Sequence, residues 1–194
     1  MASADLRDLC CHGETACEAW LASTETESFR PSPGKERRSH FASEAGPGGT
    51  RFSKIWISEA DLASSFVPEV LESVVLHELG HACQRYWLDR AGARPGDAGY
   101  DEALGPETAN CLRERLEKQR DQSVAEGRDV DFDAWEGEAF ADAVFADARL
   151  SPWLWATSVR TLEDSDHPPY SVMLPCLASR PAVRAAFCSL KSLE

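Results

Sequence analysis

The sequence predicts an α+β fold that is mostly helical, with a small sheet packed on one long helix. Three observations support this prediction. Several segments carry apolar residues at helical spacing, one segment is rich in β-branched and aromatic residues, and stretches rich in glycine and proline separate them. With 194 residues the chain is long enough to bury a core, and we expect a single domain spanning residues 1–194.

The N-terminal part is expected to hold one helix, one loop and one strand. Apolar residues recur at helical spacing over residues 5–28. Residues 30–50 carry three prolines and four glycines, which predicts a flexible loop. Residues 51–58, with the sequence RFSKIWIS, are rich in β-branched and aromatic side chains, so we expect a strand there.

Longer helices are expected further along the chain. Pro68 suits the first position of a helix because its missing N–H would be unpaired there anyway. Apolar residues continue at helical spacing as far as Tyr86, and Gly92 is a suitable stop. Residues 92–106 hold four glycines and two prolines, which predicts a loop. Three more helices are predicted, over residues 107–125, from Asp133 to about residue 150, and from Pro181 to the C-terminus.

The composition disfavours two classes of function. Asp and Glu total 33 against 20 Lys and Arg, and the net charge of −13 repels phosphates, so no nucleic-acid partner is expected. No apolar run reaches the roughly 18–20 residues that span a bilayer, so no membrane span is expected. Residues 1–5 also lack the charged and apolar segments of a secretory signal.

Seven cysteines leave at least one thiol outside any intramolecular disulfide. The preferred interpretation is a set of reduced, buried cysteines in a cytoplasmic protein. The alternative is one or two disulfides, such as Cys176 with Cys188, in a secreted protein, so the compartment stays open. A structural zinc site near the N-terminus is a third interpretation, although the paired CxxC spacing is absent. Its ligands would come from Cys10, Cys11, His12 and Cys17.

The strongest functional signal is His77-Glu78-Leu79-Gly80-His81, an HExxH motif inside the apolar helix. Residues four apart lie on one face of a helix, so His77 and His81 can both bind one zinc ion. Glu78 lies beside that face and can act as general base on a metal-activated water. Two histidines and a glutamate are otherwise costly within an apolar helix, which favours a metal site over a chance match.

A catalytic zinc ion needs a third protein ligand and one open position. The metzincin pattern would require glycine and histidine where the chain has Gln84 and Trp87, so that class is excluded. The downstream segment WEGEAFAD offers carboxylates instead. Glu138 and Asp142 are four apart, so one can bind the metal while the other accepts a hydrogen bond from a ligating histidine. Glu138 is the favoured ligand, and Glu136 is the alternative.

The HELGH motif and this acidic segment together resemble the gluzincin metallopeptidases, including thermolysin-like, CAAX-processing and ImmA-type peptidases. The resemblance covers two short helices. It implies a zincin-like fold with a small sheet packed on the HExxH helix. It also implies one Zn²⁺ ion held by His77, His81 and Glu138. Glu78 would then be the general base, and Asp142 would hydrogen-bond a ligating histidine.

A weaker resemblance involves Asp166-His167-Pro168-Pro169-Tyr170, which is similar to the His-Pro segment of the CAAX-type peptidases. In those peptidases an Arg that follows a few residues later helps to stabilise the oxyanion, and this chain has Met173 at that position. His167 or Tyr170 can instead donate a hydrogen bond to the developing oxyanion. A helix-capping loop with an exposed histidine is the alternative. Gluzincins also align extended substrate along a strand edge beside the active-site helix, and residues 51–58 are the best candidate for that edge.

We therefore expect a zinc metallopeptidase that hydrolyses peptide bonds in a peptide or protein substrate. Two alternatives stay open. One is a regulatory or binding protein that keeps the metal for structure, and the other is a metal-dependent hydrolase of a non-peptide substrate. The acid beside the two histidines disfavours the first alternative, because a structural site has no need of it. Nothing in the sequence indicates an oligomeric state.

Overall fold

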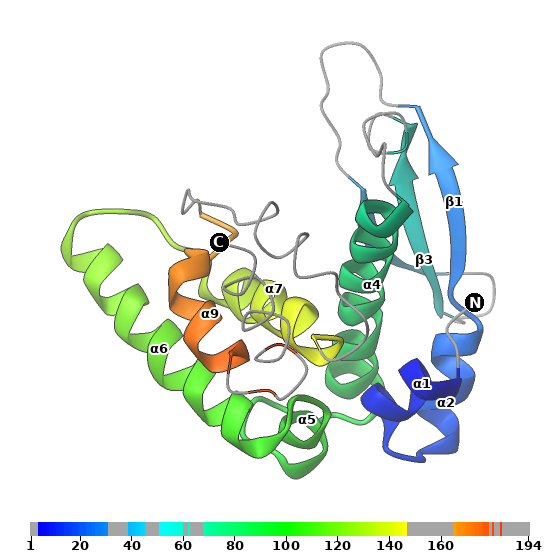
Figure 1. The fold of residues 1–194 in the computed structure, drawn as a ribbon, viewed down its shortest axis with the longest axis horizontal. Helices are drawn as coiled ribbons and strands as arrows, with labels where there is room; N and C mark the ends of the chain where they lie inside the picture. The colour runs from blue at the N-terminus through cyan, green and yellow to red at the C-terminus, as the bar shows by residue number, and fades with distance from the viewer. Residues whose placement is uncertain are drawn as a thin grey trace, which may run out of the picture.

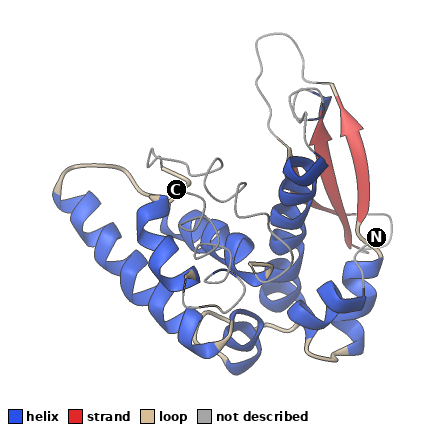
Figure 2. Ribbon diagram, viewed as in Figure 1, coloured by secondary structure: helices blue, strands red, loops and turns tan. Residues whose placement is uncertain are grey.

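The computed structural model describes residues 4–30, 39–45, 51–59, 62, 68–146, 165–178, 180 and 183. In this part of the chain, one long helix lies between a three-stranded sheet and a group of further helices (Figure 1). The described residues are mostly helical, with a small mixed sheet (Figure 2), which agrees with the predicted α+β class. None of their helices is both long and apolar enough to cross a membrane.

The elements are named by their order in Figure 1. The strands are β1 (Glu25–Phe29), β2 (His40–Ala45) and β3 (Arg51–Ser58). The helices are α1 (Ala4–Cys11), α2 (Thr15–Ala22), α4 (Pro68–Arg85), α5 (Ala98–Leu104), α6 (Pro106–Ala125), α7 (Phe132–Val144) and α9 (Tyr170–Leu177). A short π-helix, Tyr86–Arg90, continues α4.

β3 is the central strand of the sheet, whose order is β1-β3-β2. β1 pairs with β3 in parallel and β2 pairs with it antiparallel, with Phe41 opposite Ile55. The strand predicted over residues 51–58 is confirmed, but it is paired on both sides and offers no free edge. Part of the loop predicted over residues 30–50 instead forms β2. Its partner β3 lies in another segment of the chain, so the local sequence does not reveal the pairing.

Long-range pairing also corrects the N-terminal prediction. Residues 5–28 do not form one helix, because α1 and α2 are separated by a turn in which His12 and Gly13 have positive φ. A left-handed backbone of this kind ends a helix. β1 then begins at Glu25, beyond the last apolar residue of the helical pattern, and pairs with β3.

The downstream helices that were predicted within the described residues are present, but the bounds of some of them differ from the prediction. α4 begins at Pro68 as predicted, and α6 covers the helix predicted over residues 107–125. The loop predicted over residues 92–106 contains α5. The cap of α7 is Asp131, whose side chain accepts a hydrogen bond from the backbone of Ala134, and not Asp133. The helix predicted from Pro181 lies outside the described residues, apart from residue 183.

Six of the cysteines form disulfides, which contradicts the preferred interpretation of reduced thiols. The bonds are Cys10–Cys83, Cys11–Cys17 and Cys111–Cys176. The suggested pair of Cys176 with Cys188 is wrong, because α6 packs beside α9 and brings Cys111 to Cys176. The side chain of Cys188 lies outside the described residues.

Candidate metal centre

Two imidazoles project from one face of α4. His77 and His81 are about one helical turn apart, and their Nε2 atoms lie 3.2 Å from each other. Neighbouring positions on α4 hold the helix in place, because Leu76 and Leu79 are buried in the core. The packing of α4 and helical spacing therefore place the two imidazoles on one face.

The neighbouring helix α7 approaches α4 at the level of the motif. A Cβ atom added to Gly80 would lie only 2.5 Å from the carbonyl oxygen of Ala141. A side chain of any size would separate the helices, so glycine at this position sets their distance. The close approach brings the third donor, Glu138, to the two histidines.

Glu138 completes a group of three donors. Its Oε2 atom lies 3.3 Å from Nε2 of His77, and its Oε1 atom lies 3.4 Å from Nε2 of His81. Ligands about 2.0–2.1 Å from a tetrahedral zinc ion are about 3.3 Å from one another, so the spacing fits such an ion. Among the described residues, these three side chains form a group that could hold a metal ion, and Glu136 is not part of it.

Asp142 fixes the orientation of one ligand. Its Oδ1 atom lies 2.8 Å from Nδ1 of His77, so the Nδ1–H donates to the carboxylate and Nε2 faces Glu138. Burial opposes a charge on His77, but Asp142 and Glu138 outweigh burial and raise the pKa of His77 well above its ordinary value. The two carboxylates therefore favour positive charge at this position.

Glu138 is held in its ionised form, as a metal ligand must be. Burial disfavours its charge, but hydrogen bonds from His77 and His81 outweigh burial and keep the pKa of Glu138 below its ordinary value. These hydrogen bonds involve the same nitrogen and oxygen atoms that would bind a shared ion. The residues present therefore fit a divalent metal.

Glu78 is a buried acid with a perturbed pKa. Its side chain is only 6% exposed. Burial raises the pKa of Glu78 to about 7; a charge on His77 opposes this shift, and the charge on Glu138 adds to it. The backbone N–H of Phe41, in β2, donates a hydrogen bond to the carboxylate. A carboxyl group with a pKa near neutrality can both accept and release a proton.

His167 reaches the same group from a distant part of the sequence. Its Nε2 atom lies 3.5 Å from Oε2 of Glu138, and its side chain is 22% exposed. The alternative of an exposed loop histidine does not hold. Tyr170 begins α9, but its side chain lies outside the part of the structure that is described.

A large cleft opens over these residues. Its volume is about 1410 Å³, and one wall is formed by residues 39–41 and Ser43 of the β2 region. The opposite wall belongs to α7 and includes Glu136, whose pKa is raised by burial and by the nearby Asp133. Glu136 is therefore a cleft residue and lies apart from the three-donor group.

The β2 wall is the part of the site that sequence reasoning missed. β2 is an edge strand beside α4, whereas β3, predicted to provide the edge, is central. The only local signal for β2 is a pair of aromatic rings, His40 and Phe41, inside a segment dominated by glycine, proline and charge.

The site thus belongs to a general class, a cleft that holds two histidines and one glutamate around a position for a cation. Comparison of the chain with protein-family models, with curated proteins and with solved structures finds no match. The functional interpretation therefore rests on the geometry of the site.

Proposed function

We propose that the protein is a zinc-dependent metallopeptidase of the gluzincin type. The observation that carries the proposal is the convergence of His77, His81 and Glu138, at tetrahedral spacing, on the wall of a cleft that also contains the buried acid Glu78. A structural metal site is usually closed by a fourth side chain. The described residues place no fourth ligand in this group.

The donor set favours zinc over magnesium and calcium. Two imidazole nitrogens and one carboxylate are the ligands of a catalytic zinc site, whereas magnesium and calcium prefer oxygen alone. When bound here, zinc would supply Lewis-acid polarisation of water and of a substrate carbonyl. The protein contributes the orientation of the ligands, which Asp142 enforces through His77.

Glu78 transfers the proton between the attacking water and the leaving amine. With a pKa of about 7 it is partly ionised near neutral pH, so its carboxylate can take a proton from the attacking water and later donate it to the leaving amine. His167 lies across the group from α4 and supplies a ring N–H toward the reacting carbonyl oxygen.

The shape of the cleft favours an extended peptide as substrate. β2 pairs with β3 along one side only, and residues of the β2 region line the cleft beside Glu78. A peptide can add to such an edge through main-chain hydrogen bonds, whatever its side chains are. The substrate would then run past the acid that Phe41 holds in place.

A pair of isosteric variants tests the proposal. Glu78→Gln should keep zinc and lower the cleavage of a peptide library by about 10²–10⁴-fold, because the proton acceptor is gone. Glu136→Gln makes the same chemical change on the opposite wall of the cleft and should keep both properties. Zinc is measured by elemental analysis and cleavage by mass spectrometry. Equal activity of wild type and Glu78→Gln, or zinc-loaded wild type that cleaves no peptide, would contradict the proposal.

A further inference from the structure

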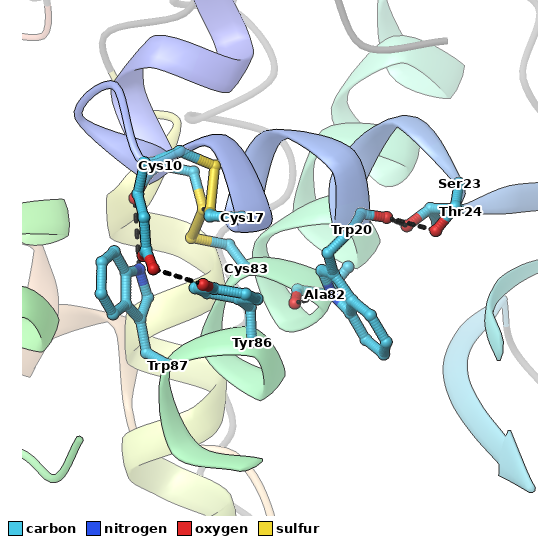
Figure 3. Close-up of a disulfide and its surroundings, with 11 residues drawn as sticks. Cys10, Cys17, Trp20, Ser23, Thr24, Ala82, Cys83, Tyr86 and Trp87 are labelled. Carbon is cyan, nitrogen blue, oxygen red and sulfur yellow. Dashed lines mark hydrogen bonds between the residues drawn. A yellow bond between two sulfur atoms is a disulfide. The ribbon is translucent and has the colours of Figure 1, made fainter. Parts of the chain in front are cut away.

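Four cysteine sulfurs gather behind the metal centre, between α4 and the two N-terminal helices. Cys10 and Cys11 end α1, Cys17 lies in α2 and Cys83 lies in α4, two residues after His81. We call these four residues the cysteine cluster. All four side chains are buried, with at most 1% exposed. Figure 3 shows Cys10, Cys17 and Cys83 pointing toward one another from these three helices.

The two disulfides of the cluster contact each other. Cys10 is bonded to Cys83 and Cys11 to Cys17, while Sγ of Cys10 lies only 3.6 Å from Sγ of Cys17. The sulfurs of Cys10, Cys11 and Cys17 all lie within 4.8 Å of one another. Sulfur ligands about 2.3 Å from a tetrahedral zinc ion are about 3.8 Å apart, so these three sulfurs lie within reach of one ion, and Cys83, whose sulfur is bonded to that of Cys10, can supply the fourth ligand.

Hydrogen bonds as well as the disulfides hold the helices around the cluster. The indole N–H of Trp20 donates to the carbonyl of Ala82 at 2.9 Å, and that of Trp87 donates to the carbonyl of Cys10 at 3.2 Å. The hydroxyl of Tyr86 donates to Glu14 at 2.7 Å. These three hydrogen bonds join both N-terminal helices to α4 and its continuation, in addition to the disulfides (Figure 3).

The third disulfide is different in kind. Cys111 and Cys176 join α6 to α9, and no other cysteine of the described residues belongs to a metal-binding group with them. It is a crosslink between two helices and provides an internal control for the cluster.

We propose that the cysteine cluster is a redox-responsive metal site, which holds two disulfides when oxidised and a second zinc ion on four thiolates when reduced. Reduction by a dithiol transfers two electrons and two protons to each disulfide, which becomes two thiols, while the dithiol is oxidised to a disulfide. Binding of Zn²⁺ then displaces the four thiol protons and forms four zinc–sulfur bonds. The site is independent of the three-donor group on the cleft.

Cobalt titration of the whole protein tests this proposal. The protein is stripped of metal, reduced with a phosphine under argon, freed of reductant and titrated with Co²⁺, with absorption and circular dichroism recorded together. The reduced protein should show thiolate-to-cobalt charge-transfer absorption that saturates once about one equivalent is bound at the cluster, and the oxidised protein should show none. Added Zn²⁺ should displace the cobalt and remove the band. This readout does not depend on peptidase activity or on the histidine site.

Matched variants identify the ligands. Cys11→Ala/Cys17→Ala removes two of the four proposed ligands and should abolish the charge-transfer band, whereas Cys111→Ala/Cys176→Ala should retain it. His77→Ala should also retain it. If reduction unfolds the chain, Co²⁺ should restore the helical signal together with the band. The proposal is overturned if reduced wild type lacks the band in either case, or if the band persists without Cys11 and Cys17.

Discussion

Replacement of Gly80 by alanine should weaken metal binding without touching a ligand. The new Cβ would lie 2.5 Å from the carbonyl oxygen and 2.6 Å from the Cα of Ala141. Ordinary contacts between such atoms are about 3.5 Å or more, so α4 and α7 must separate by about 1 Å. Both obstructing atoms belong to backbone, and no rotamer change can relieve the contact.

The size of the effect follows from the spacing of the donors. Glu138 now lies 3.3 and 3.4 Å from the two imidazole nitrogens, and a shift of about 1 Å in α7 moves it out of ligand range of a shared ion. We expect a loss of zinc affinity of about 100-fold, at the upper end of the effects of disturbed ligand support. Overpacking should cost about 1–3 kcal/mol of stability, offset in part by about 1 kcal/mol of helix propensity.

Zinc competition against a chromophoric chelator measures the affinity, and urea unfolding with excess chelator measures the stability. Gly137→Ala is the matched control in α7, next to Glu138. Its Cβ would lie 3.3 Å from the side-chain oxygen of Gln84, which can move, so zinc affinity should stay within a few-fold of wild type. Wild-type affinity in Gly80→Ala would refute the reasoning, because the helix contact would then not position Glu138.

Two further predictions concern single carboxylates. Asp142→Asn should lower zinc affinity by about 10–100-fold, because the charged acceptor of the His77 Nδ1–H is lost. The same competition assay measures the affinity. An unchanged affinity would show that Asp142 does not support the site. In metal-free protein, Glu78 has a folded-state pKa of about 7 against an ordinary value of 4.5. The native state therefore keeps a proton that the unfolded chain releases, and this group should contribute a loss of about 3 kcal/mol of stability in wild type as the pH rises from about 4.5 to 7. Glu78→Gln should lack this loss when the free energy of unfolding is measured with chelator at each pH. Parallel curves of stability against pH for the two proteins would show that the buried carboxyl does not titrate as described.

The parts of the site that lie within one helix follow from sequence. Helical spacing alone places His77 with His81 on one face, and Glu138 with Asp142 on another. Pro68 marks the start of the ligand helix in both the sequence and the structure. Such relations depend on local geometry, so the residues near them in sequence are enough to reveal them.

Relations between distant segments do not follow in this way. Cys10 and Cys83 are 73 residues apart, and seven cysteines allow many pairings that spacing cannot distinguish. β2 has a composition typical of a loop and becomes a strand because β3 offers it a partner. His167 joins the site only because the chain returns to the cleft after α7. Each of these depends on tertiary packing.

The crosslink between Cys111 and Cys176 encloses a stretch of chain that contains both Glu138 and His167. A single peptide-bond break between those two residues would put them on different fragments, yet the fragments would stay covalently joined. Such a nicked molecule would migrate as one band on a gel without reductant and as two bands with it. The bond would thereby keep both parts of the candidate site in one covalently joined molecule after such a break.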